Sequence, residues 1–322
     1  MALPPDMKLD RKAVRPLVGD LRQAASVRRI VLDDGPERGV RALAFSTGGG
    51  LDFWALSDRT LDIGTLSWRG TPVAWQGVNG FRAGSFYDAA DEEARGFNRN
   101  FSGFMVTCGM DHIRQPVNDH PLHGRLPFTP AMLGAYGEDW DRQTPILFCE
   151  GEVVQGRLHG EVLRLHRRIE APVGGNRLTI IDKVTNDGIK AIPQALLYHM
   201  NIGWPALRDG SELLLDGTRL LGPFKLPDPD SDNFAESFLM EKGRMAECSL
   251  ISPGFDARLT VAFDTSTLPH LQIWRDARPN VHAVGIEPCT SARLPGGFSG
   301  PEPILELGET RTYRVEVRFD PA

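Results

Sequence analysis

Strand-like runs with a period of two dominate this sequence and constrain its fold more than any other feature. The clearest is TYRVEVRF at 312–319, in which Tyr313, Val315, Val317 and Phe319 alternate with charged residues. Successive side chains of a strand point to opposite faces, so this run predicts one face in a core and one in water. Comparable runs are VRALAFS at 40–46, LDFWALS at 51–57, LTIIDKV at 178–184, ALLYHMN at 195–201, RLTVAFD at 258–264 and HLQIW at 270–274. The pattern predicts an all-β sandwich.

Helical patterning is weak and is confined to short candidates near residues 9–17 and 235–243. The 34 glycines and 24 prolines are spaced as turns between strands would be. The segment LPDPDSDN at 226–233 is predicted to be a surface loop, and no repeat or linker divides the chain. Because a large sandwich can form one unit, we expect a single domain over 1–322 with a short N-terminal extension over about residues 1–20.

Charge and hydropathy narrow the range of partners. The formal charge is -6, with acidic and basic residues mixed along the chain. This distribution offers no basic patch for nucleic acid or a membrane surface and favours a small ligand. The N-terminal stretch MALPPDMKLDRKAVRPL has no apolar run typical of a signal peptide, and no later segment reaches the roughly 20 apolar residues of a membrane span. A cytoplasmic protein, monomer or homodimer, is expected.

The four cysteines are widely spaced and form no CxxC pair. They are Cys108, Cys149, Cys248 and Cys289. Such spacing predicts neither a disulfide framework nor a zinc site, so reduced and mostly buried thiols are expected. Cys289 follows a carboxylate by two residues and could be a reactive thiol, although a small buried residue is the more common role at a strand end.

Two strand-like segments carry the first candidate site residues. In ALLYHMN, alternation places Leu197, His199 and Asn201 on one face. A lone strand histidine is often simply a core residue. In VHAVGIEPCTS an apolar strand ends in Glu287, followed by Pro288, which interrupts the pairing. An unpaired buried carboxylate is costly, so Glu287 either faces a cleft or forms an ion pair with an arginine.

Further candidates lie in three other segments. The irregular loop NDHPLHGRLPFTPA places His120, His123 and Arg125 where polar side chains can converge on a ligand or, less commonly at this spacing, a metal. A strand continuing through LSDRTLDIG would put Arg59 and Asp62 on opposite sides, and a surface ion pair is the alternative.

In the strand HLQIW, His270, Gln272 and Trp274 share one face. An aromatic ring beside an amide is typical of a sugar site, although Trp274 could equally pack in the core.

In order along the chain, these segments resemble the aldose 1-epimerase superfamily. The closer resemblance is to a bacterial subfamily of aldose-epimerase-like proteins grouped as a domain of unknown function, DUF4432. It covers nearly the whole chain. Its landmarks are LSDRTLDIG at 56–64, FSGFMVTCGM at 101–110, LHGRLPFTPA at 122–131, DKVTNDG at 182–188, LLYHMNIGWP at 196–205 and GIEPCTS at 285–291.

The resemblance implies a large antiparallel sandwich of galactose-mutarotase type, with a cleft on the concave face of a large sheet. It implies that His199 protonates the ring oxygen of a sugar, that Glu287 takes the proton from the anomeric hydroxyl, and that His123 lies nearby. Arg59 and Arg125 are characteristic of the subfamily, as is Asp62. They are expected in the substrate site with Asn201, Gln272 and Trp274.

The chemistry suits that assignment, because ring opening of an aldose needs a base at O1 and an acid at O5. Unperturbed pKa values would leave Glu287 ionised and His199 partly protonated near neutrality. Neither a metal nor an organic cofactor is required. Guanidinium groups bind carboxylate, sulfonate or phosphate, so Arg59 and Arg125 predict an acidic or modified sugar as partner.

The prediction is therefore an isomerase that interconverts sugar anomers, with Glu287, His199 and His123 as its catalytic residues. Two alternatives stay open. One is another carbohydrate enzyme, a lyase or a metal-assisted isomerase using His120, His123 and His199. The other is a carbohydrate-binding sensor without catalysis.

Overall fold

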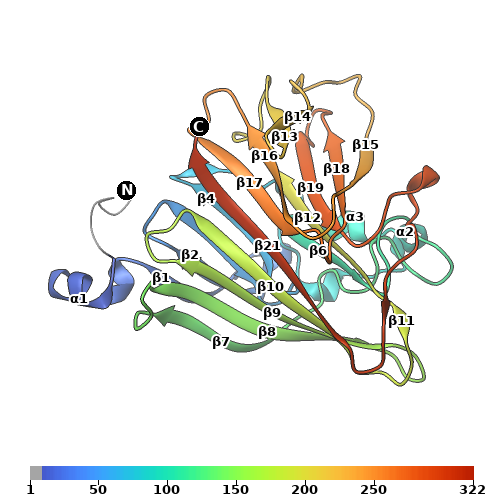
Figure 1. Cartoon of the computed structure of the whole chain (residues 1–322), viewed down its shortest axis with the longest axis horizontal. Coiled ribbons are helices and arrows are strands. Elements are labelled where there is room, and N and C mark those ends of the chain that lie inside the picture. Colours follow the sequence, from blue (N-terminus) through green and yellow to red (C-terminus); the bar gives the residue numbers. More distant parts are fainter. Residues whose placement is uncertain (1–8) are drawn as a thin grey trace.

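The computed structural model describes residues 9–322 and forms an antiparallel β-sandwich (Figure 1). Its largest sheet has nine strands, in the order β14 (Thr218–Leu221), β13 (Glu212–Leu215), β16 (Met245–Ile251), β17 (Ala257–Asp264), β21 (Thr310–Pro321), β10 (Arg177–Asn186), β9 (Val162–Pro172), β8 (Ile146–Gly156) and β7 (Met132–Asp139). The predicted fold class is confirmed. The first eight residues of the expected N-terminal extension lie outside the described part of the chain.

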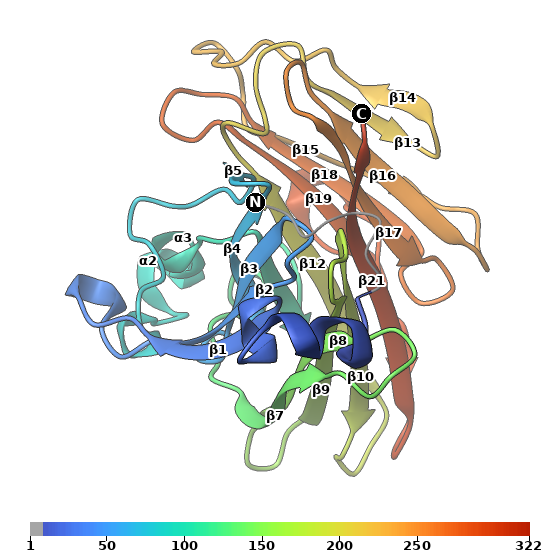
Figure 2. The same ribbon diagram turned by 90° about the vertical axis from the view of Figure 1, so that its left-hand side faces the viewer.

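Two five-stranded sheets face this large sheet, and Figure 2 shows β1–β4 on one side and β12, β18 and β19 behind. The first has the order β1 (Ser26–Val31), β2 (Arg41–Ser46), β3 (Leu51–Leu56), β4 (Asp62–Trp68) and β5 (Thr71–Pro72). The second has the order β15 (Phe234–Leu239), β18 (His270–Asp276), β19 (Ala283–Cys289), β12 (Ala195–Ile202) and β6 (Met105–Met110). A short pair, β11 (Ile192–Pro193) and β20 (Ile304–Leu305), completes the strands.

Alternation along the strands sets the core. In β21 the four apolar residues Tyr313, Val315, Val317 and Phe319 are buried, as predicted, while Arg314 between them is exposed. Apolar side chains from β9, β10, β12 and the first five-stranded sheet join them in one core. The other strand-like runs also form strands.

Helices are short, as expected from the sequence. They are α1 (Arg11–Val14), α2 (Asp91–Ala94) and α3 (Phe97–Asn100), with single turns of 3-10 helix at Arg15–Leu17, Leu21–Gln23, Gly35–Glu37, Gly84–Phe86 and Pro295–Gly297. The helix predicted near 9–17 is confirmed by α1 and the turn that follows it. No helix among residues 9–322 has the length and apolar character needed to cross a membrane.

The helix predicted near 235–243 is wrong. Residues Phe234–Leu239 form β15, which pairs antiparallel with β18 from Phe234↔Arg275 to Leu239↔His270. Pairing with a neighbouring strand satisfies the backbone groups and overrides a weak helical pattern. The segment 226–233 before it contains no helix or strand, so the predicted loop is confirmed.

Candidate functional site

The central polar residues come from three adjacent strands of the second five-stranded sheet. In β18 and β19, Gln272 is paired directly with Glu287. In β12 and β19, Met200 pairs with Ile286, which sets His199 opposite Glu287. Because cross-strand partners point to the same face, Gln272, Glu287 and His199 form a row across the sheet. The resemblance implied a cleft on a large sheet, but this row lies on the five-stranded sheet rather than the nine-stranded one.

The faces of β12 agree with the predicted alternation. Tyr198 and Met200 point into the sandwich core, whereas His199 and Asn201 lie on the opposite face. Both faces are covered, since every residue of β12 is buried. A strand buried on two sides can hold a polar group rigidly, provided that the group finds hydrogen-bond partners there.

A continuous chain of contacts links the row. Nε2 of His199 lies 3.1 Å from Oε1 of Glu287, and Nε2 of Gln272 donates to Oε2 of Glu287 at 2.5 Å. Oε1 of Gln272 in turn accepts from Nε of Arg114 at 2.8 Å. At the other end, Nδ1 of His199 lies 2.5 Å from Oδ1 of Asn201. His199 and Glu287 are therefore in direct contact.

The tautomer of His199 follows from Asn201. The amide nitrogen of Asn201 donates to the carbonyl oxygens of Gly103 and His199, each at 3.0 Å, so its Oδ1 must face the imidazole. Only an N–H can satisfy that oxygen, which assigns the proton to Nδ1. In a neutral imidazole, Nε2 then presents a lone pair toward Glu287. The contact becomes a hydrogen bond when Glu287 carries the proton, because Oε1 otherwise has no donor.

Burial shifts both groups away from their ordinary ionisation. It raises the pKa of Glu287 to about 8, an effect opposed first by the Gln272 hydrogen bond and then by the charges of Arg114 and Arg293. It lowers the pKa of His199 to about 3, opposed by the Asn201 hydrogen bond. Both shifts run against the ionised Glu287 and partly protonated His199 expected from unperturbed pKa values, because desolvation penalises both charges. We call the two residues, which share one proton, the Glu287–His199 dyad.

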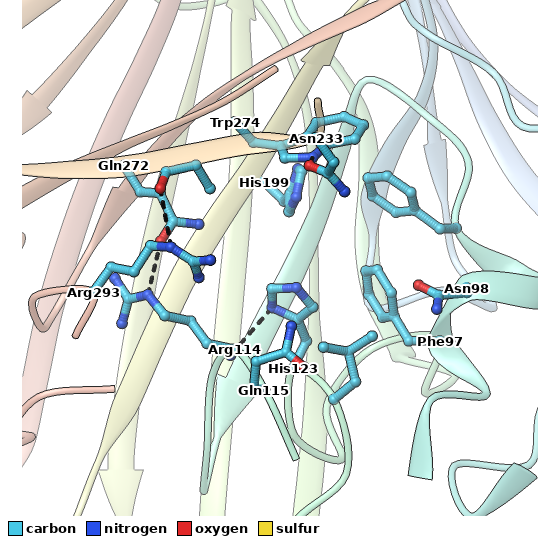
Figure 3. A pocket seen from close by; sticks show the side chains of 13 residues that line it. Phe97, Asn98, Arg114, Gln115, His123, His199, Asn233, Gln272, Trp274 and Arg293 are labelled. Atoms are coloured by element: carbon cyan, nitrogen blue, oxygen red, sulfur yellow. Dashed lines mark hydrogen bonds between the residues drawn. The ribbon is translucent and has the colours of Figure 1, made fainter. Parts of the chain in front are cut away.

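A pocket of about 180 Å³ opens beside the dyad (Figure 3). Figure 3 shows Arg114 and Arg293 on one wall, Phe97 and Asn98 on the opposite wall, and His199 with Trp274 between them. The lining residues are Phe97, Asn98, Phe101, Arg114, Gln115, Leu122, His123, His199, Asn233, Ala235, Gln272, Trp274 and Arg293. Glu287 is not among them, because it is fully buried, but it contacts His199 and Gln272 of the pocket lining. His199, His123, Gln272 and Trp274 are thus brought together at the pocket, as the sequence predicted.

Aromatic rings surround the imidazole of His199. The ring centroids of Phe101, Trp274 and His123 lie 4.8, 5.4 and 5.7 Å from it, all in edge-on arrangements. Trp274 is fixed by donating its Nε1–H to Asn233 at 2.7 Å. Burial, together with the neighbouring His199, holds the pKa of His123 well below its ordinary value, so His123 is neutral. The result is an apolar cage with a few directed polar groups, as is typical of small-ligand sites.

Four residues predicted to bind substrate do not line the pocket. The guanidinium of Arg59 is buried over the Phe128 ring at 4.4 Å and donates to the carbonyl oxygen of Asn100. The expected strand through this segment is interrupted because Thr60 and Leu61 adopt positive φ in a turn before β4. Arg59 therefore points into the protein interior rather than to a ligand.

Asp62 and Arg125 are likewise engaged elsewhere. Asp62 accepts from Arg167 at 2.9 Å and from the Thr107 hydroxyl at 2.6 Å, deep inside the sandwich. Arg125 pairs with Asp111 at 2.5 Å, and His120 bonds the same carboxylate at 2.9 Å. Asn201 is also absent from the pocket wall, because it lies behind His199 and orients it. The structure does not bring these side chains to the pocket wall, and the reason is the same for each: the side chain is held by protein partners.

The metal alternative required His120, His123 and His199 to converge. Within residues 9–322, no three His, Cys, Asp or Glu side chains gather in an arrangement that could hold a metal ion. The four cysteines are free and buried, as predicted. Burial raises the pKa of the Cys289 thiol to about 12, so the reactive-thiol alternative is not supported.

Sequence reasoning missed two arginines of the pocket wall. Arg114 lies in the segment between β6 and β7 at φ 73°, and Arg293 follows β19. No periodicity marks either one, because both lie outside strands. The phenylalanines 97 and 101 were also missed, since nothing local distinguishes them from core residues. The only signal was proximity in sequence to His123 and to Glu287.

Gly285 provides the space in which Glu287 meets His199. A Cβ at this position would lie 2.6 Å from Oε1 of Glu287 and 3.2 Å from Cε1 of His199. We expect Gly285→Ala to displace the carboxylate and to lower the rate of a reaction at this site about 10²-fold, the effect of a misplacement near 1 Å. Steady-state kinetics and a thermal melt check this, with Gly19→Ala, at an exposed position without a positive φ, as the control for an added methyl group. Unchanged turnover would contradict it.

Comparison with known proteins places this chain in a family. Among curated proteins, none matches the chain. Three crystal structures share its fold at low sequence identity. A protein from Klebsiella pneumoniae, provisionally assigned as an aldose 1-epimerase, superposes with a TM-score of 0.82 at 20% identity, covering 97% of this chain and 86% of its own. A galactose mutarotase-like protein from Clostridium acetobutylicum gives 0.64 at 12% identity, with 93% and 100% covered.

The galactose 1-epimerase of Lactobacillus acidophilus gives a TM-score of 0.56 at 14% identity, with 92% of this chain and 99% of that one covered. These likenesses establish the galactose mutarotase-like sandwich. The family model described as Domain of unknown function (DUF4432) matches residues 37–319. The chain therefore belongs to the DUF4432 family.

Proposed function

We propose that this protein is an aldose 1-epimerase that interconverts the anomers of a monosaccharide by general acid–base catalysis. The observation that carries the proposal is the Glu287–His199 dyad, in which Nε2 of His199 lies 3.1 Å from Oε1 of Glu287 and His199 lines a small pocket. A volume of about 180 Å³ lies below the range of pockets for drug-sized ligands and suits a single sugar ring. The named functions of the structural relatives are consistent with this chemistry.

In the proposed mechanism the dyad moves its proton before ring opening. The mechanism starts with Glu287 protonated and His199 neutral, the forms that burial favours. A sugar hydroxyl donating to the carboxylate favours its ionised form, so the proton passes to Nε2 of His199. His199 then protonates O5 while Glu287 takes the proton from the O1 hydroxyl. The C1–O5 bond breaks, C1 and O1 form a carbonyl, and the dyad again holds one proton.

Ring closure reverses these transfers after rotation about the C1–C2 bond. O5 attacks the other face of the carbonyl carbon and loses its proton to His199, while Glu287 returns a proton to O1. The flanking residues position the reacting groups: Asn201 keeps the Nδ1–H tautomer, and Gln272 holds Oε2 of Glu287. Neutral His123 and the Trp274 ring would bound the sugar from two sides. No proton is gained or lost over the cycle.

The pH dependence of anomer exchange tests the proposal. The dyad carries a single proton between the pKa of His199, about 3, and that of Glu287, about 8. We therefore expect kcat/KM to be nearly flat between pH 5 and 7 and to fall as the pH rises through about 8, since kcat/KM reports ionisation of the free enzyme. Exchange NMR on a panel of aldoses and uronic acids supplies the rates.

The control for this experiment is the same sugar panel without protein, which corrects for spontaneous mutarotation at each pH. Absence of acceleration across the panel would contradict the proposed function, and binding without acceleration would point to a carbohydrate sensor. A rate that instead rises through pH 6–7 would show an imidazole of ordinary pKa acting alone, which is incompatible with the dyad.

A further inference from the structure

The pocket wall carries a positive charge that the acid–base chemistry does not use. Its lining contains two arginines, Arg114 and Arg293, and no aspartate or glutamate. Burial raises the pKa of the two carboxyl groups that interact with these arginines, Glu287 and Glu302, and so favours their neutral forms. A neutral sugar needs hydrogen bonds but no net charge around it. An uncompensated cationic wall in a partly buried pocket is costly unless a ligand supplies an anion.

The two guanidinium groups differ in how many N–H donors they keep free for a ligand. All three nitrogens of Arg114 are committed to protein acceptors, and the side chain is fully buried. Nε donates to Gln272, Nη1 to the hydroxyls of Ser291 and Ser299, and Nη2 to Sγ of Cys289 and the carbonyl oxygen of Ser291. Arg114 therefore braces Gln272 and supplies charge, but it has no donor left for a ligand.

Arg293 is held through its backbone N–H and its Nε, whereas its two terminal nitrogens are free. Its backbone N–H donates to the Ser237 hydroxyl at 2.8 Å, and its Nε donates to the carbonyl oxygen of Ala235 at 3.1 Å. Among residues 9–322, Nη1 and Nη2 meet no hydrogen-bond or ion-pair acceptor. Both lie against Gly297, where a Cβ would stand 2.8 Å from Nη1 and 2.9 Å from Nη2. Figure 3 shows the guanidinium turned toward the centre of the pocket.

We propose that Arg293 binds an anionic group of the substrate, so that the protein acts on a sugar bearing a carboxylate or a phosphate. A guanidinium anchored through Nε presents its two terminal nitrogens as a fork, which matches the paired oxygens of either anion. The neutral amides of Asn98, Gln115 and Asn233 remain for the sugar hydroxyls. This inference rests on the proposed function for its orientation, with the anomeric centre at the dyad and the anion at Arg293.

Binding to a protein without turnover tests this inference separately from catalysis. We would titrate the Glu287→Gln protein with glucose, glucuronate and glucose 6-phosphate, and with galactose and galacturonate, by calorimetry or ligand-observed NMR. At least one anionic sugar is expected to bind ten-fold or more tightly than its neutral counterpart. Preference for the uronates identifies a carboxylate, and preference for glucose 6-phosphate identifies a phosphate.

The second arm adds Arg293→Gln to the same background. It is expected to weaken binding of the preferred anionic sugar 10- to 100-fold and to change binding of the neutral sugar less than two-fold, while Arg293→Lys restores part of the loss. Arg219→Gln, on the exposed strand β14, is the matched control and should change neither. Equal binding of neutral and anionic sugars, equal weakening of both, or no binding of any sugar would overturn the inference. Arg293-dependent anion binding without anomer exchange in the wild-type protein would instead overturn the proposed function.

Discussion

Replacing Glu287 by glutamine is expected to lower kcat for anomer exchange about 10²–10⁴-fold, the usual contribution of one positioned acid–base group. The amide can keep the hydrogen-bonded contact with Gln272 and adds no bulk, so the pocket should stay intact. It cannot hold the transferable proton that the dyad needs. Exchange NMR with the preferred sugar measures the loss, and Glu241→Gln, an exposed carboxylate, serves as the control.

The same variant should be more stable than the wild type in alkaline solution. The pKa of Glu287 is raised from 4.5 to about 8 by burial, so its stabilising contribution is present below pH 4.5 and is lost as the pH rises through about 8. Glutamine has no such dependence. Between pH 5 and pH 8 the variant should gain about 3 kcal/mol in unfolding free energy relative to the wild type. Parallel stability curves with pH would contradict a buried, protonated Glu287.

Replacing Arg167 by methionine is expected to destabilise the fold by about 3–5 kcal/mol, because it leaves buried charges without a partner. Arg167 pairs with Asp62 at 2.9 Å and with Asp182 at 2.6 Å, and all three side chains are at most 3% exposed. Tyr198 also donates to Asp182, at 2.7 Å. The cluster joins β9 and β10 of the large sheet to β4 and β12 of the two smaller sheets. Urea unfolding monitored by tryptophan fluorescence measures the effect.

A surface ion pair provides the comparison for this prediction. Arg219→Met removes the contact with Glu212 at 3.3 Å, in which the arginine is 60% exposed, and should change stability by less than about 1 kcal/mol. A similarly small effect of Arg167→Met would mean that Asp62 and Asp182 become protonated or hydrated at little cost. Expression too poor for unfolding measurements would itself fit the expected large loss, and circular dichroism of the residual protein would then record the missing fold.

The fold class could be predicted because the alternation of apolar and polar residues that marks a strand lies within a few neighbouring residues. Alternation in β21 and β12 assigned each side chain to a face, and the structure buries the expected ones. The error at β15 has a physical cause. A six-residue segment with weak periodicity forms a strand only because β18 offers it a partner. Pairing between residues 31 to 41 positions apart leaves no mark in a short window of sequence.

The pocket residues that lie on strands could be predicted from the sequence. The arginines of the pocket could not, because ion pairs and burial determine which arginines stay free. His199, Gln272 and Trp274 follow from alternation, and all line the pocket. Arg59 and Arg125 were chosen for their charge, yet burial and pairing hold both in the protein framework. The hypothesis of an anionic sugar now rests on Arg293 instead. The chain has 36 lysines and arginines. Whether one of them keeps free N–H donors depends on the acceptors around it, and those acceptors are brought together only when the chain folds.

The strands under the pocket carry the Glu287–His199 dyad, while the pocket walls come largely from connecting segments. Residues 97–101, 114–123, 233 and 293 all lie outside the sheet, whereas the dyad is fixed by backbone pairing within it. Loops accept substitution and insertion more readily than paired strands do. The residues that would recognise a ligand and those of the dyad can therefore change independently. A substitution in the connecting segments can reshape the pocket walls and leave the pairing that holds the dyad as it is.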